Sequence, residues 1–217
     1  MSQIVSTYLL DDLEESLSME REEFFESQVQ TFRDLGRPTR AVEVVDLILF
    51  TPKKEFILQR RSSNKLENAG LIDTTIGAIV PFGRSPAFVV MASTLRELKI
   101  PSFVFGEGED FKETYQLLET YVNNSAIVQL ADSRTANFKK TYNGESVVIA
   151  NKYHLYLGVY GGPAHMNLAE VAGLTVFSAS TLQAERASKP ESFTSDLVFF
   201  LDEYEKKIGA FLRNLPT

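Results

Sequence analysis

The segment from residue 77 to residue 100, GAIVPFGRSPAFVVMASTLRELKI, is the feature that most restricts how this chain can fold. Its first residues read as the end of a strand, Pro81 and Gly83 predict a turn, and Ser85 followed by Pro86 is typical of a helix N-cap and first helical position. A loop that joins a strand to a helix N-terminus is a usual place for a ligand site. We therefore expect the fold and any functional site to be organised around this strand, loop and helix.

Composition limits the class of protein. At 217 residues, with 44% hydrophobic residues, 24% charged residues and 16 Phe, the chain is expected to form a single folded domain. A net charge of -7 without a large basic cluster argues against binding to nucleic acid or to a membrane surface. The absence of Cys excludes a Cys-based zinc site, and two His exclude a three-His site. An early acidic N-terminus and the lack of a long apolar run predict a cytoplasmic protein.

The N-terminal residues predict an amphipathic helix from residue 8 to residue 35, ended by Gly36. We expect residues 1–36 to form this helix and residues 37–217 to form the main domain. The helix has two possible roles, as a cover over the main domain or as a dimerisation arm, so a homodimer is possible. The apolar residues behind the helix prediction are Leu10, Leu13, Leu17, Phe24, Phe32 and Leu35.

The rest of the chain predicts strands that mostly form hairpins. Residues 39–50 and 55–60 predict one hairpin, and Asn143-Gly144 predicts the turn of another. Because hairpins outnumber strand–helix alternations, the fold class is expected to be α+β or an α/β/α sandwich. The other predicted strands are 73–80, 125–130, 138–142, 146–150, 154–160 and 172–177, and the later helices are 111–121, 180–185 and 194–215.

Two segments resemble the Nudix hydrolase superfamily. Residues 44–86 are similar to the family's first hairpin, which leads to a glycine-containing loop and a helix, and residues 170–197 are similar to its closing segment, with Phe193-Thr194-Ser195-Asp196-Leu197 opening the last helix. The resemblance covers roughly residues 39 to 205 and implies a Nudix-like α/β/α sandwich with a mixed sheet. Specificity in this fold resides in loops, here 64–70 and 161–167.

The family's signature, GX5EX7REUXEEXGU, aligns without a gap when Ile100 takes its final position. Of its four glutamates, only the last is retained, as Glu97. An alternative alignment puts the family's Arg-Glu-Leu on residues 96–98, but it needs a four-residue insertion. The other signature positions carry Ala78, Arg84, Ala92, Ser93, Arg96 and Lys99.

These replacements bear on metal binding. Positions 93, 96 and 97 share one helix face, where carboxylates could hold Mg²⁺ or Mn²⁺ and activate a water. A guanidinium about 6 Å from a divalent ion costs roughly 5 kcal/mol at an effective dielectric constant near 20. The leading hypothesis is therefore a protein that binds a small phosphorylated, nucleoside diphosphate-type ligand with weak or no hydrolysis. Its anion-binding residues are predicted to be Arg60, Arg61, Arg84 and Arg96.

Three alternatives stay open. Arg84 or Arg96 could simply pair with Glu97 in a surface ion pair. An active hydrolase could use Glu97 as a catalytic residue and metal ligand, together with acids from elsewhere. In that case the cofactor would be Mg²⁺ or Mn²⁺, and its further ligands besides Glu97 would come from Glu107, Glu109, Asp110 or Glu170. A regulatory or protein-interaction module would need no such chemistry, and His154 and His165 are expected to be structural.

Overall fold

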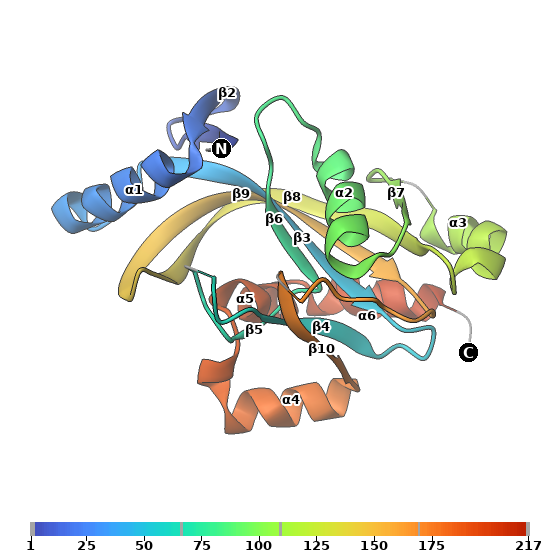
Figure 1. Cartoon of the computed structure of the whole chain (residues 1–217). Coiled ribbons are helices and arrows are strands. Elements are labelled where there is room, and N and C mark those ends of the chain that lie inside the picture. Colours follow the sequence, from blue (N-terminus) through green and yellow to red (C-terminus); the bar gives the residue numbers. More distant parts are fainter. Residues whose placement is uncertain (1–2, 66, 109, 169, 216–217) are drawn as a thin grey trace.

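The molecule is built on the parallel pairing of two long strands, β3 (Arg40–Phe50) and β9 (Glu145–Val159). The computed structural model describes residues 3–65, 67–108, 110–168 and 170–215. The two strands are in register from Ala41 opposite Ala150 to Phe50 opposite Val159. β3 is buried along almost its whole length, as expected for a continuous apolar run covered on both faces. This pair forms the middle of the sheet in Figure 1.

In the described part of the chain the sheet has ten strands. Besides β3 and β9 these are β1 (Ile4–Leu9), β2 (Asp12–Glu20), β4 (Phe56–Arg61), β5 (Ile72–Asp73), β6 (Ile76–Ile79), β7 (Ser102–Phe105), β8 (Ala126–Tyr142) and β10 (Val171–Phe177). The main order is β10-β4-β3-β9-β8-β7, with β1 and β6 pairing with β3, β2 with β1 and β5 with β4. The β7–β8 and β3–β9 pairs are parallel and the other pairs are antiparallel, so the sheet is mixed.

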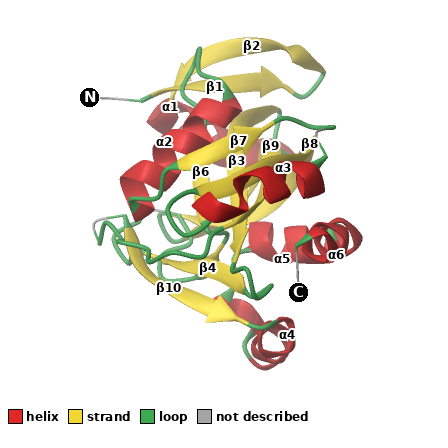
Figure 2. Cartoon of the chain, turned by 90° about the vertical axis from the view of Figure 1, so that its right-hand side faces the viewer, coloured by secondary structure: helices red, strands yellow, loops and turns green. Residues whose placement is uncertain are grey.

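Helices cover both faces of the sheet. Helix α2 (Pro86–Leu98) lies over one face, and α5 (Ser195–Glu203) and α6 (Glu205–Asn214) lie over the other, as Figure 2 shows. Alternate residues of β3 point to these two layers: Val45, Leu47 and Leu49 pack in the core under α2, and the neighbouring positions pack under α5 and α6. The remaining helices are α1 (Arg21–Leu35), α3 (Phe111–Leu118) with a 3-10 turn η1 (Glu119–Tyr121), α4 (Ala179–Ser188) and η2 (Pro190–Ser192). The predicted α/β/α sandwich is confirmed.

Among the described helices, none is long and apolar enough to cross a membrane.

The prediction of one helix over residues 8–35 is wrong in its first half. Residues 4–20 form the β1–β2 hairpin, and only Arg21–Leu35 are helical, with the helix ending at Gly36 in a left-handed conformation (φ 68°). Leu13 and Leu17 are four residues apart, a spacing that fits one face of a helix and also one face of a strand. Pairing of β1 with β3 decides between the two, since Thr7 and Tyr8, which pair with Val42 and Ala41, are buried. A domain boundary at residue 36 remains a prediction.

Two further segments differ from the sequence prediction in length. The strands predicted at 125–130, 138–142, 146–150 and 154–160 merge into one long hairpin of β8 and β9, with Asn143 (φ 49°) and Gly144 (φ 82°) as its turn. The helix predicted over 194–215 is divided at Tyr204. The Tyr204 hydroxyl donates to Asp132 Oδ2 at 2.7 Å and contacts the Tyr153 hydroxyl at 2.7 Å, so contacts with the sheet fix this break.

Between the sheet and the start of α5 lies a group of buried charges, here called the buried charge cluster. Four ion pairs belong to it, together with the carboxyl group of Asp46. They are Lys140–Asp196 at 3.1 Å, Lys140–Glu67 at 4.0 Å, Arg61–Asp73 at 2.8 Å and Arg21–Glu67 at 2.8 Å. Within the described residues, Asp46 has no ion pair and accepts one hydrogen bond, from the Thr74 hydroxyl at 3.3 Å. Burial, reinforced by the charges of Asp196 and Asp73, raises the pKa of Asp46 well above its ordinary value.

The raised pKa of Asp46 predicts how stability depends on pH. Because the folded protein holds this proton more tightly than the unfolded chain, stability falls as pH rises from about 3.9, the unfolded pKa, to the raised folded pKa. Asp46→Asn keeps the hydrogen bond from Thr74 and removes this loss. We expect the variant to be more stable than the wild type at neutral pH, with a difference that shrinks towards pH 4. Urea denaturation across this pH range measures the difference, and equal stabilities at pH 7 would contradict a raised pKa of Asp46.

Lys140 is expected to be essential to the cluster, because it is the cation paired with Asp196. Lys140→Met leaves the buried Asp196 without that partner, and removing one member of a buried ion pair typically costs about 3–5 kcal/mol. The matched control is Lys139→Met at the exposed neighbouring position, with an expected change below about 0.5 kcal/mol. Urea denaturation of the two variants at pH 7 measures both losses of stability. Equal losses would show that the Lys140–Asp196 ion pair does not stabilise the fold more than an exposed lysine does.

Candidate functional site

Helix α2 begins as the sequence predicted. Ser85 is the N-cap, its side chain accepts a hydrogen bond from the Phe88 amide, and Pro86 occupies the first helical turn. Val89, Val90 and Leu98 anchor the helix in the core beneath it. The helix is therefore held rigidly against the sheet.

On one side of α2, Arg96 and Glu97 form an ion pair. Arg96 Nη2 lies 2.7 Å from Glu97 Oε1 and 3.4 Å from Ser93 Oγ. The Glu97 side chain is only 8% exposed, whereas that of Arg96 is 55% exposed. The pairing expected from the sequence thus exists for Arg96, but its acidic partner is buried rather than on the surface.

A second carboxylate reaches this region from the loop between β9 and β10. The Asn167 amide donates to the Glu97 carbonyl at 2.7 Å, and the His165 amide donates to the Leu98 carbonyl at 3.0 Å. These two backbone bonds hold the loop against the end of α2. Three residues beyond Asn167, Glu170 forms an ion pair with Lys65, in which Lys65 Nζ lies 2.6 Å from Glu170 Oε2. Lys65, Arg96, Glu97 and Glu170 are called the α2 charge cluster below.

The two carboxyl groups of the cluster differ in acidity. Burial raises the pKa of Glu97, the negative charge of Glu170 adds to that effect, and the hydrogen bond from Arg96 opposes it. The hydrogen bond from Lys65 lowers the pKa of Glu170, and the charge of Arg96 contributes in the same direction. The cluster therefore contains one carboxylate firmly ionised by its lysine and one that takes up a proton more easily.

The structure does not bring the other predicted arginines to this cluster. Arg84 lies over the Phe88 ring, 5.2 Å from its centroid, and Arg60 donates to the Gly70 carbonyl at 2.8 Å. Arg61 is held in the buried charge cluster by Asp73. Ligand binding by these residues stays a prediction, and for Arg61 it would require breaking a buried ion pair.

Of the acids considered for a relocated metal site, Glu170 lies in the α2 charge cluster with Glu97. Asp110 caps helix α3 by accepting from the Lys112 and Glu113 amides, Glu107 is exposed, and Glu109 lies outside the described residues. No group of three or more His, Asp or Glu side chains arranged to hold a metal ion occurs in the part of the chain that the structure describes.

Both histidines have structural contacts. His154 Nε2 lies 2.9 Å from Glu43 Oε1, and its Nδ1 lies 2.8 Å from Ser133 Oγ. His165 contributes its backbone amide to the contact between its loop and α2.

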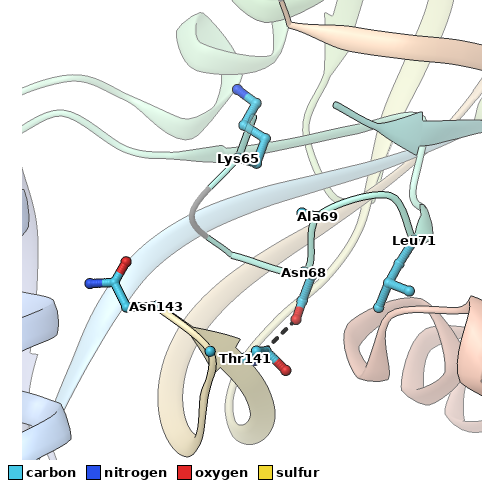
Figure 3. Close-up of a pocket in the computed structure, with 7 residues that line it drawn as sticks. Lys65, Asn68, Ala69, Leu71, Thr141 and Asn143 are labelled. Atoms are coloured by element: carbon cyan, nitrogen blue, oxygen red, sulfur yellow. Dashed lines mark hydrogen bonds between the residues drawn. The ribbon is translucent and has the colours of Figure 1, made fainter. Parts of the chain in front are cut away.

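Lys65 also forms part of the wall of a pocket that Figure 3 shows in close-up. The pocket has a volume of about 410 Å³ and lies between the loop after β4 and the tip of the β8–β9 hairpin. The Thr141 amide donates to Asn68 Oδ1 at 3.2 Å across one side of it. Sequence reasoning missed Lys65, although it lies in the loop 64–70 expected to carry specificity. The lining residues are Lys65, Asn68, Ala69, Leu71, Thr141, Asn143 and Gly144.

The Arg96–Glu97 contact predicts the effect of one substitution. Arg96→Gln removes the cation that favours the ionised carboxylate, so we expect the pKa of Glu97 to rise further. Carboxyl-carbon NMR titration of wild type and variant measures this shift. The control is Lys99→Gln, which removes an exposed cation from the same end of the helix and is expected to leave Glu97 nearly unchanged. If Arg96→Gln left the titration of Glu97 unaltered, the ion pair would be absent in solution.

No protein-family model matches the sequence, and no curated protein matches it. A MutT protein from Methanosarcina mazei Go1 aligns over 77% of this chain and 94% of its own, with a TM-score of 0.53 and 17% identity. A bifunctional NMN adenylyltransferase/ADP ribose pyrophosphatase from Francisella tularensis aligns over 87% of this chain and 47% of its own, with a TM-score of 0.50 and 9% identity.

The Nudix domain of NrtR from Shewanella oneidensis aligns over 88% of this chain and 99% of its own, with a TM-score of 0.48 and 11% identity. At these identities the likeness concerns the fold alone. The mixed sheet between α2 and α5–α6, together with the two matches at TM-scores of 0.53 and 0.50, shows that this chain has the Nudix fold.

Proposed function

We propose that this chain is a Nudix-fold protein that binds a small phosphorylated ligand, of nucleoside diphosphate type, with weak or no hydrolysis. The observation that carries the proposal is that each carboxylate of the α2 charge cluster is already neutralised by a cation of the chain itself. Glu97 is paired with Arg96 and Glu170 with Lys65. The guanidinium group of Arg96 therefore lies on the helix face where the family signature would place carboxylates, and the ammonium group of Lys65 lies beside it in the cluster.

A divalent ion would meet one main obstacle at this cluster, because it would have to displace both cations from Glu97 and Glu170. Mg²⁺ requires near-octahedral oxygen coordination, usually from one or two carboxylates together with phosphate groups and water. Ser93 offers at most a neutral hydroxyl, and its side chain is fully buried. Ordinary metal-dependent hydrolysis is therefore disfavoured.

A phosphate group suits the same arrangement better. Arg96 is half exposed and Lys65 is 39% exposed, so both can turn from their carboxylates to an anion, and such hydrogen bonds between ionised groups are the stronger kind. The pocket next to Lys65 has a volume within the range of small-molecule sites, about 300–1,000 Å³. Asn68, Thr141 and Asn143 would offer hydrogen bonds to the rest of the ligand. The Francisella tularensis protein, solved with AMP and a manganese ion, supports the ligand class.

One observation favours the alternative of an active hydrolase. Glu170, in the loop before β10, lies close enough to Glu97 on α2 for its negative charge to raise the pKa of Glu97. Two carboxylates brought together from a helix and a loop could hold Mg²⁺ or Mn²⁺ if both cations moved away. In that reading Glu97 would be the essential ligand and catalytic residue.

Calorimetric titration with AMP and ADP-ribose in the presence of EDTA tests the binding proposal. We expect the wild type to bind one of them without metal, and Lys65→Gln/Arg96→Gln to weaken binding by about tenfold or more, because each charged hydrogen bond contributes about 1.5–3 kcal/mol. Lys99→Gln is the matched control and should bind like the wild type.

Two outcomes would contradict this proposal. One is binding that the double variant leaves unchanged. The other is Mn²⁺-dependent release of mononucleotide from ADP-ribose that Glu97→Gln abolishes, which would establish the hydrolase alternative.

A further inference from the structure

Helix α2 is apolar on the side that faces away from the sheet as well as on the side that faces the core. Phe88, Met91 and Leu95 recur at helical spacings of three and four and are 49%, 46% and 53% exposed. Two further side chains extend this stripe at its N-terminal end, Phe82 (47% exposed) and Ile4 (44% exposed), which are linked by the hydrogen bond from the Phe82 amide to the Ile4 carbonyl. These five residues are called the α2 apolar face.

The exposed apolar area of this face is larger than that of single apolar residues scattered over a protein surface. Five large side chains, each close to half exposed, present roughly 400 Å² of apolar surface. Contiguous patches of this size on monomers are about as large as such patches become and are often functional. A stable interface buries about 800 Å² on each partner, more than half of it apolar. The α2 apolar face therefore has the area of the core of an ordinary protein–protein interface.

The charges around the face indicate the chemistry of its partner. Arg84, Arg96 and Lys99 are exposed along α2, and its one acid, Glu97, is buried. A complementary partner has exposed apolar side chains surrounded by acids. Like charges across an interface suppress a wrong partner, so a second α2 helix, with the same cations, is a poor match.

The chain itself carries a surface of the required kind. The first 20 residues contain five acids and no Lys or Arg, and the acids all lie exposed on the β1–β2 hairpin: Asp11, Asp12, Glu14, Glu15 and Glu20. None of the five forms an ion pair within the described residues. In the described part of the chain, β2 pairs with no strand other than β1, although its Leu13 carbonyl accepts a hydrogen bond from Lys152 Nζ at 3.1 Å. Leu9 of the same hairpin is 40% exposed.

We propose that the α2 apolar face is a self-association surface, on which the acidic β1–β2 hairpin of a second copy packs. The hairpin and α2 lie towards the same end of the molecule in both views, and Ile4 belongs to both surfaces. A two-fold axis at that end therefore lets each copy offer its hairpin to the other, which gives a closed dimer with two identical contacts. Acids of the hairpin then lie beside Arg84, Arg96 and Lys99. Arg96 is shared with the proposed ligand site, whereas Phe88, Met91 and Leu95 have no part in that site.

Sedimentation velocity of the full chain over a concentration series tests the proposal. We expect a dimer at low salt whose dissociation constant rises at least tenfold between about 50 mM and 500 mM NaCl, because salt screens exposed charges. Met91→Glu places an acid in the centre of the face and should yield a monomer at all concentrations. Leu117→Glu is the matched control, since Leu117 is 78% exposed on α3, outside the face, and this variant should remain dimeric.

A second variant identifies the partner surface. Neutralising four of the hairpin acids, Asp11→Asn, Asp12→Asn, Glu14→Gln and Glu15→Gln, should weaken the dimer by about tenfold or more and flatten its salt dependence. A wild type that is monomeric throughout the concentration series would overturn the proposal, as would a dimer that survives Met91→Glu. A dimer that Met91→Glu dissociates but that the neutralised hairpin leaves intact would overturn the assigned partner, because it would show that α2 packs against something other than the hairpin.

Discussion

The parallel pairing of β3 with β9 is the contact on which the rest of this structure depends. Because the two strands run in the same direction, β9 ends beside the end of β3, where the Tyr160 amide donates to the Phe50 carbonyl at 2.9 Å. The chain leaving β9 therefore emerges on the edge where α2 also ends, and the loop carrying Glu170 is held against α2 by backbone hydrogen bonds to Glu97 and Leu98. Carboxylates far apart in sequence meet through this geometry.

The same geometry explains how the fold handles charge in its interior. Carboxyl groups are shielded from water in the buried charge cluster and in the α2 charge cluster. In each cluster most of these groups are paired with Lys or Arg, as the burial of an ion requires. The buried charge cluster has one carboxyl group more than it has cations, and the pKa of the unpaired carboxyl group, Asp46, is raised. The α2 charge cluster is balanced, which leaves no net negative charge to attract a divalent ion.

Local signals account for what the sequence could predict. The N-cap Ser85, the Asn143-Gly144 turn and the apolar run of β3 each specify their structure within a few residues, and all three are found. Long-range contacts account for the failures. The N-terminal hairpin depends on pairing with β3, and the break at Tyr204 depends on Asp132, 72 residues away. The site divides in the same way. Arg96 and Glu97 are neighbours on a predicted helix, whereas Lys65 and Glu170 meet only once the loops are placed, 105 residues apart.

The central claim, that side chains of the chain itself neutralise the carboxylates beside α2, is tested most directly by Mn²⁺ titration followed by electron paramagnetic resonance. The account predicts that the wild type leaves the signal of free Mn²⁺ unchanged up to about 1 mM, because no site of useful affinity exists. Stoichiometric uptake of Mn²⁺ at micromolar concentration, lost in Glu97→Gln, would contradict it.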